Sequence, residues 1–195
     1  MTATLSGIFA ALPGIENISP DGIQRWLKTR SSIHSIENYL ANRILYPQTV
    51  PVNEEEKQID RAIIQEYIFC NPAYFYNPLS HKLIIPAGVV VRIQPLSDLM
   101  LILCSILNLS AITPVFILEE NTNKEEGCVI IPTIAQSEQK VLITIDGQPS
   151  QIEKGKFYHL PVPDQHVKLK ISNMNEIMVP GGKIGIVIDL RERKK

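Results

Sequence analysis

Residues 82–118 read KLIIPAGVVVRIQPLSDLMLILCSILNLSAITPVFIL, and this stretch decides the fold class. Two short runs near its start, Lys82–Ile85 and Val89–Ile93, are rich in Ile and Val and are predicted to be buried β-strands. The longer apolar run Leu96–Leu109 is predicted to be a buried helix, and Thr113–Leu118 a further strand. A strand, a helix and a strand in this order favour a parallel strand pair joined by a right-handed crossover.

The residues before this stretch carry the signals of helices. Ser19 can cap a helix with Pro20 at its first position, and Ser32 can cap a second helix. Asn53 followed by Glu56 has the form of a capping box and predicts a third helix. The inner faces are expected to hold Ile33, Ile36, Leu40 and Ile44 in the second helix, and Ile59, Ile63, Ile64 and Tyr67 in the third.

Two segments with two prolines each interrupt the helical pattern. Tyr46–Val52 is predicted to be an extended connector, because proline disfavours helix both at its own position and at the residue before it. Asn71–Ser80 also holds three aromatic residues and is predicted to be a loop that packs against the core. Trp26 and Tyr74–Tyr76 are interpreted as core residues, with an interaction surface as the alternative.

The second half of the chain changes to the period of a β-strand. Apolar and polar residues alternate in Val167–Ile171, and Val141, Ile143 and Ile145 alternate ahead of a hairpin turn at Asp146-Gly147. Lys183–Asp189 is apolar on both faces and is predicted to be a central strand.

The predicted fold class is α/β with α+β character. It comprises N-terminal helices, a β-α-β unit of a mixed sheet, and a C-terminal antiparallel β region. Segments 1–120 and 121–195 hold these parts and are expected to form one compact unit, since 195 residues with 45% hydrophobic content can supply a core.

Composition excludes several function classes. Nineteen basic and twenty acidic residues give a formal net charge of -1, so no positive field is expected to attract nucleic acid. The run Leu96–Leu109 contains Asp98 and is too short to span a bilayer, so no membrane partner is expected. The N-terminal residues do not form a secretion signal, and three widely spaced cysteines suit a reducing compartment. These features predict a cytoplasmic protein.

Short motifs favour structural over chemical interpretations. Asp164-Gln165-His166 begins like the DxHxxG motif of base-off cobalamin enzymes, but Leu169 replaces the glycine, and His166 is interpreted as a solvent-facing strand residue. Gly181-Gly182 precedes a predicted strand, which favours a turn over a phosphate loop. Neither metal-ligand spacing nor a hydrolase motif occurs, so no metal and no catalytic residue is expected. The histidines considered are His34, His81, His159 and His166.

Four stretches resemble, in order, segments of one known family. They are NYLAN at Asn38–Asn42, YPQTVP at Tyr46–Pro51, IPAGV onward at Ile85–Val115, and PGGKIGIVID at Pro180–Asp189. Together they resemble the C-terminal half of the glutamate mutase L family, which is named for its association with an adenosylcobalamin-dependent mutase. The resemblance covers residues 1–193 and implies one lobe of an actin-like ATPase fold.

Two departures from the family pattern imply that ATPase chemistry is lost. Thr4-Leu5-Ser6-Gly7 stands where the family has an acidic loop that holds phosphate and metal. Pro86, Ala87 and Gly88 stand where the family has a glycine-rich nucleotide loop, and proline removes an N–H donor while alanine adds bulk. We interpret Pro86-Ala87-Gly88 as a vestigial nucleotide loop, and expect no cofactor and no ATP hydrolysis by this chain alone.

The resemblance implies a non-catalytic scaffold or assembly module that binds another protein or a second copy of itself. The motivation is that a lobe of a two-lobed fold exposes a partly apolar surface where the other lobe would lie. One alternative is a chain of a split ATP-dependent chaperone or reactivase, with a partner completing the nucleotide site. A small-ligand binding protein that uses the vestigial cleft is a third hypothesis.

Overall fold

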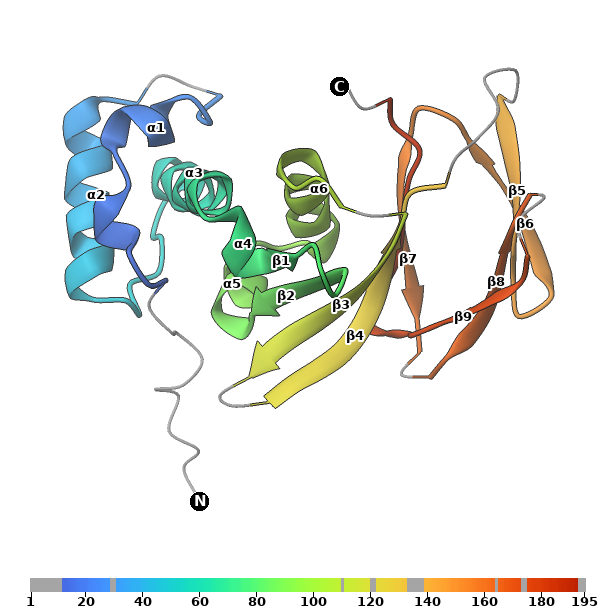
Figure 1. Ribbon diagram of the computed structural model, residues 1–195. Helices are drawn as coiled ribbons and strands as arrows, with labels where there is room; N and C mark the ends of the chain where they lie inside the picture. Colours follow the sequence, from blue (N-terminus) through green and yellow to red (C-terminus); the bar gives the residue numbers. More distant parts are fainter. Residues whose placement is uncertain are drawn as a thin grey trace. The chain divides into compact units, whose positions relative to one another are not determined.

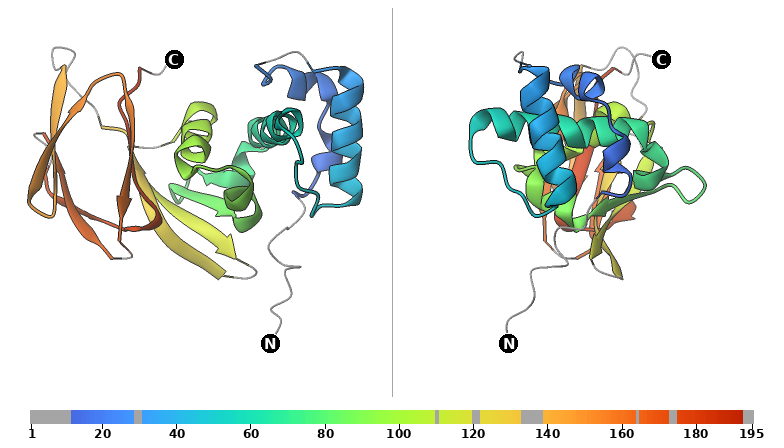
Figure 2. Two further views of the ribbon diagram at one scale, coloured as in Figure 1. Left: turned by 180° about the vertical axis from the view of Figure 1, so that it is seen from behind. Right: turned by 90° about the vertical axis from the view of Figure 1, so that its left-hand side faces the viewer.

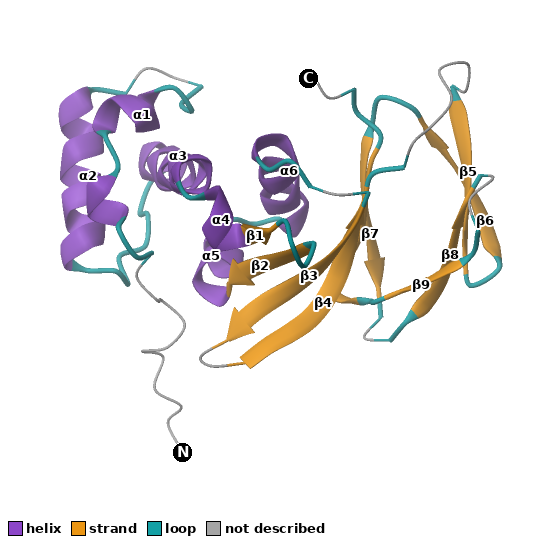
Figure 3. Cartoon of the chain, viewed as in Figure 1, coloured by secondary structure: helices purple, strands orange, loops and turns teal. Residues whose placement is uncertain are grey.

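The computed structural model describes residues 12–28, 31–109, 111–119, 122–132, 139–163, 165–172 and 175–192. It contains both helices and strands, with a mixed sheet and an antiparallel sheet, which confirms the predicted fold class (Figures 1 and 3). The chain divides into two compact units. The helical unit holds Met1–Phe75, Ile85–Leu107 and Leu118–Thr122, and the sheet unit holds Tyr76–Ile84, Asn108–Ile117 and Asn123–Lys195.

The helical unit is organised around one long helix. α3 (Glu54–Cys70) contacts the other α-helices of this unit, α1, α2, α4, α5 and α6. In the right-hand view of Figure 2, α2 and α3 cross each other steeply. The remaining bounds are η2 Ile15–Asn17, α1 Pro20–Gln24, α2 Ile33–Leu45, α4 Pro72–Phe75, α5 Ala87–Arg92 and α6 Leu96–Ile106.

The predicted helix caps are confirmed. The side chains of Ser19, Ser32 and Asn53 each accept a hydrogen bond from the backbone N–H three residues further on. The Glu56 carboxylate also turns back, but it accepts from the N–H of Val52, which is one residue earlier than in a capping box (2.8 Å). Glu56 therefore fixes the end of the connector as well as the start of α3.

The inner face of α2 differs from the prediction. Ile36 and Leu40 are buried as expected, but Ile44 is exposed, and Tyr39 and Arg43 are buried in its place. The face is rotated because the Arg43 guanidinium pairs with a carboxylate inside the unit. In α3 the predicted inner residues are all buried: Ile59, Ile63, Ile64 and Tyr67.

The prediction of a strand at Val89–Ile93 is wrong. These residues belong to α5, whose Val89 and Val90 are buried while Val91 is exposed. A short apolar run bounded by proline and glycine has no period that separates a strand from a buried helical turn. The packed loop predicted at Asn71–Ser80 does bury Phe75, and it also contains α4 and the short strand β1.

The sheet unit contains two sheets. A mixed sheet has the strand order β1-β2-β3-β4-β10-β7, and an antiparallel sheet has the order β6-β5-β8-β9. In Figure 1 the arrows of β2 and β3 run the same way, as expected for the predicted β-α-β connection. The bounds are β1 Tyr76–Asn77, β2 Lys82–Pro86, β3 Ile112–Glu119, β4 Thr122–Ile130, β5 Lys140–Ile145, β6 Gln148–Glu153, β7 Phe157–Val162, β8 Val167–Ile171, β9 Ile177–Val179 and β10 Gly182–Asp189.

β10 is the central strand that its sequence predicts. It pairs in parallel with β4 and antiparallel with β7, and every residue from Ile184 to Leu190 is buried. Gly127 and Gly185 face each other across the parallel pair, and a Cβ on Gly127 would collide with the Gly185 carbonyl oxygen. Gly185 has a φ of +69°, so it combines a close backbone approach with a backbone conformation that favours glycine.

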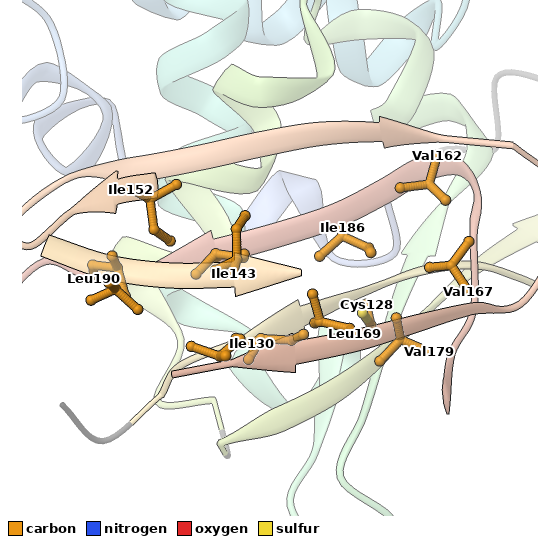
Figure 4. Packing of buried hydrophobic residues seen from close by; sticks show 13 residues of the cluster. Cys128, Ile130, Ile143, Ile152, Val162, Val167, Leu169, Val179, Ile186 and Leu190 are labelled. Atoms are coloured by element: carbon orange, nitrogen blue, oxygen red, sulfur yellow. The ribbon is translucent and has the colours of Figure 1, made fainter. Parts of the chain in front are cut away.

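The second sheet covers a hydrophobic core that it shares with β4, β7 and β10 (Figure 4). Val167, Leu169 and Ile171 of β8 are buried, while the lysines between them are exposed, which confirms the predicted alternation. The Asp146-Gly147 turn joins β5 to β6 with both residues at positive φ, as a two-residue hairpin turn requires.

Candidate functional site

Three helices of the helical unit each bring one buried charged side chain to the same place. Arg43 of α2 and Arg92 of α5 flank Asp60 of α3, and the exposed fractions of the three side chains are 5%, 7% and 4%. The Arg43 Nε lies 2.9 Å from one carboxylate oxygen of Asp60, and an Arg92 nitrogen lies 3.3 Å from the other. Two buried guanidinium groups therefore share one carboxylate, and we call these residues the charge cluster.

The charge cluster holds the backbone of the connector Tyr46–Val52. Arg43 and Arg92 both donate to the Pro47 carbonyl, at 2.8 and 2.6 Å, and Arg92 also donates to the Thr49 carbonyl at 3.0 Å. The Thr49 N–H in turn donates to the Tyr46 carbonyl and closes a turn around Pro47. Hydrogen bonds from a charged donor are about twice as strong as neutral ones, so the connector is firmly fixed.

Burial shifts the titration of the groups in this cluster. It raises the pKa of the Tyr39 hydroxyl well above its usual range, and the negative charge of Asp60 adds to that effect. Burial lowers the pKa of Arg43, the Asp60 carboxylate opposes the shift, and the like charge of Arg92 adds to it. Tyr39 therefore stays neutral and lends the cluster no second negative charge.

Several apolar side chains in and beside the connector are exposed. Leu45, at the end of α2, is 69% exposed, and Tyr46, Val50 and Val52 are 57%, 58% and 81% exposed. We call these four residues the connector surface. A buried ionic cluster thus fixes a segment whose own apolar side chains contribute little to the core.

A second cluster centres on the buried Glu66 of α3. Its carboxylate accepts two hydrogen bonds from Arg25, at 2.6 and 2.9 Å, and one from the Trp26 indole at 2.7 Å. The Arg25 guanidinium lies 4.1 Å from the centre of the half-exposed Phe69 ring. The Cys70 thiol donates to Glu66, and its pKa is raised by burial and by that contact. Trp26 is partly buried in this cluster and is not a fully buried core residue.

An open groove of about 360 Å³ runs along one face of α3. Lys57 and Arg61 lie on this face, in exposed ion pairs with Glu54 (3.4 Å) and Asp98 (2.7 Å) respectively. Arg92 of the charge cluster also reaches the groove. Its lining residues are Trp26, Leu27, Lys28, Glu54, Lys57, Gln58, Arg61, Gln65, Arg92, Ile93 and Gln94.

The predicted vestigial nucleotide loop lies at the start of α5. Pro86 ends β2 and precedes the helix, and Ala87 and Gly88 form its first turn, with Gly88 buried. These three residues are not among those that line the groove. Their assignment as a former nucleotide site stays a prediction. Thr4-Leu5-Ser6-Gly7, the other predicted position, lies outside the described residues, as does Asp164.

The charge cluster was not predicted from the sequence, although a signal for it exists. Arg43 follows Tyr39 and Leu40 at helical spacing, and Asp60 stands beside Ile59, so each is a charge next to a predicted inner face. A charge in such a position indicates a buried ion pair. The sequence does not indicate that Arg92 is the third member, because its segment was predicted to be a strand.

A metal-binding cluster and a membrane-spanning helix are both absent from the described residues. Within them, no three His, Cys, Asp or Glu side chains converge to hold a metal ion. In the same part of the chain, no helix has both the length and the apolar character needed to cross a bilayer. His166 is exposed just before β8, and Gly181-Gly182 leads into β10.

Comparison of the chain with family models, with curated proteins and with solved structures returned no match. The resemblance to the glutamate mutase L family therefore stays a prediction.

Proposed function

We propose that the protein is a non-catalytic scaffold or assembly module that binds another protein, or a second copy of itself, through the connector surface. The observation that carries the proposal is the exposure of Leu45, Tyr46, Val50 and Val52 on a backbone held by the charge cluster. Apolar groups that cluster on a surface are typical of interaction sites.

The energetics of the charge cluster support a role in recognition. Moving an ion pair out of water costs several kcal/mol per ion, and apolar residues of similar volume often stabilise a core as well or better. In this protein the buried arginines direct their donors to Pro47 and Thr49, so they determine the shape of a surface segment. A segment that is already ordered loses less conformational entropy on binding, which favours affinity.

The remaining parts of the proposal concern ancestry and location. We propose a relationship to the glutamate mutase L family on the quoted motifs, one of which, YPQTVP at Tyr46–Pro51, is most of the connector. Pro86 and Ala87 in place of glycines support the loss of ATPase activity. Cys70, Cys104 and Cys128 form no disulfide bond with one another, which supports a cytoplasmic location.

Sedimentation and cross-linking of the full chain test the proposal. Sedimentation velocity over a range of concentrations would detect self-association, and the Leu45→Glu/Val52→Glu variant is expected to abolish it. Leu79→Glu is a matched control, because Leu79 is 94% exposed in the turn between β1 and β2. Control and wild type are expected to sediment alike.

A photo-crosslinking amino acid at Val50 extends the test to a different partner protein in the source cell. The same amino acid at Leu79 gives the background level. The proposal is wrong if two results are found together. The wild type sediments as a monomer, and the amino acid at Val50 gives no cross-linked species beyond the background at Leu79.

A further inference from the structure

The groove along α3 has a strong bias in charge. Its lining includes four basic side chains, Lys28, Lys57, Arg61 and Arg92, and one acidic side chain, Glu54. This excess occurs in a chain whose formal net charge is -1. Asp98 offsets part of this charge, because it pairs with Arg61 at 2.7 Å, so the net positive charge at the groove is smaller than the lining residues alone indicate.

The charge cluster contributes one net positive charge beside the groove, because Arg43 and Arg92 share the single carboxylate of Asp60 and Arg92 lines the groove. Exposed pairs such as Lys57 with Glu54 are weak and exchange readily with water. Lys57 is therefore available to an incoming carboxylate at little cost.

The dimensions of the groove suit a peptide segment. Its α3 wall extends from Glu54 to Gln65, which at 1.5 Å per residue is about 16 Å. An extended chain at about 3.3 Å per residue covers that length with roughly five residues. The side chains of Lys57 and Arg61 are 60% and 40% exposed, so the groove is open along its length. Small ligands are instead usually enclosed by their pockets.

The remaining lining residues match the other groups of a peptide. Gln65 offers an amide donor and acceptor to a peptide backbone, and Gln94, whose amide N–H donates to the Val90 carbonyl, offers its amide oxygen. Trp26 and Leu27, which are partly exposed, offer apolar contacts to its side chains. Along the chain, the connector surface ends at Val52, two residues before Glu54 of the groove lining.

We infer that the groove along α3 binds an extended acidic segment of a partner protein, with the carboxylates of that segment on Lys57 and Arg61. The inference rests on the proposed interaction role and adds the chemistry of the partner to it. The connector surface contacts the folded part of the partner, and the groove receives its acidic segment.

Fluorescence anisotropy of the full chain with a labelled peptide tests the inference. The probe is fluorescein-(Glu-Leu)₄, compared with the isosteric (Gln-Leu)₄ peptide and with a dT8 oligonucleotide. We expect the Glu peptide to bind at least about fivefold more tightly than the Gln peptide, since one charge pair near 4 Å in water contributes about 1 kcal/mol. Raising the salt from 50 to 500 mM is expected to remove this difference.

Paired variants locate the binding site. Lys57→Gln/Arg61→Gln removes two exposed cations of the groove, and is expected to weaken binding of the Glu peptide about 25-fold at low salt. Lys168→Gln/Lys170→Gln removes two exposed cations of β8 outside the groove and is expected to leave binding unchanged.

Three results would overturn the inference: equal affinity for the two peptides, equal losses in the two double variants, or tighter binding of dT8 than of the Glu peptide. The Val50 cross-link separates this inference from the proposed function. A cross-link without peptide binding refutes the groove alone, whereas peptide binding without a cross-link refutes the connector surface alone.

Discussion

Asp60 is the residue on which the charge cluster depends. Replacing it by alanine leaves Arg43 and Arg92 buried without their shared carboxylate, and removing one member of a buried pair costs about 3–5 kcal/mol. We therefore expect Asp60→Ala to lower the free energy of unfolding by about that amount in a urea titration. The connector is expected to loosen as well, and hydrogen exchange at the Thr49 amide would measure this.

Asp98→Ala is the matched control for Asp60→Ala. Asp98 pairs with Arg61 at 2.7 Å, but both side chains are more than a third exposed, so the expected loss is below about 1 kcal/mol. Equal losses in the two variants would show that the charge cluster has no special role in stability.

Glu126 gives the sheet unit a predictable dependence on pH. Burial alone would raise the pKa of this carboxyl, but Lys124 and the Lys183 N–H outweigh burial and hold the pKa below its usual range. A glutamate in the unfolded chain has a pKa near 4.3. Because the pKa of Glu126 is lower than this in the folded protein, its ionised carboxylate stabilises the fold at pH values above about 4.3. This stabilisation is lost as the pH falls through the folded-state pKa. We expect the free energy of unfolding of Glu126→Gln, measured with urea between pH 7 and 3, to fall less steeply toward low pH than that of wild type.

The exposed Glu125→Gln variant is the control for Glu126→Gln, and it is expected to follow the wild-type curve. If wild type and Glu126→Gln lost the same free energy of unfolding between pH 7 and 3, the Glu126 carboxylate would not be a source of the loss of stability in acid.

At the scale of elements, α3 is the helix whose local signals can be tested most directly. The Asn53 side chain accepts from the Glu56 N–H at 2.8 Å, and loss of such a cap costs about 1 kcal/mol. We expect Asn53→Ala to shift the urea midpoint down accordingly. The control is Asn108→Ala, an exposed loop substitution that is expected to stay within about 0.5 kcal/mol of wild type. A midpoint for Asn53→Ala equal to that control would contradict the role of the cap.

The sequence predicts those elements whose signals are local. The caps of α1, α2 and α3, the turn at Asp146-Gly147 and the central strand β10 each follow from a few neighbouring residues, and the structure confirms them. The strand prediction for Val89–Ile93 is wrong because four apolar residues within five positions fit a strand and a short buried helix equally well.

The candidate site could not be predicted, because it forms only in three dimensions. Arg43, Asp60 and Arg92 are far apart in the sequence, and no short motif links them. Their meeting depends on how α2, α3 and α5 pack, and packing also decides that Arg43 takes the inner position expected for Ile44. The connector itself was predicted, but the exposure of its apolar side chains was not.

For the whole molecule, nucleotide binding distinguishes the scaffold from the split ATP-dependent reactivase. A nucleotide loop requires backbone N–H donors close to phosphate, and Pro86 supplies none while Ala87 adds a methyl group. We therefore expect the melting temperature of the chain to be unchanged by excess Mg-ATP, as measured by differential scanning calorimetry. Mg-ADP and Mg²⁺ alone are the controls.

A ligand at 100 times its dissociation constant would stabilise the fold by about 2.7 kcal/mol. In a domain of this size, that amounts to a rise of roughly 5–10 °C in the melting temperature. Such a rise with Mg-ATP, absent with Mg²⁺ alone, would mean that the loop at Pro86-Ala87-Gly88 still binds nucleotide. The reactivase would then be the better account, and the connector surface would be where its second chain attaches.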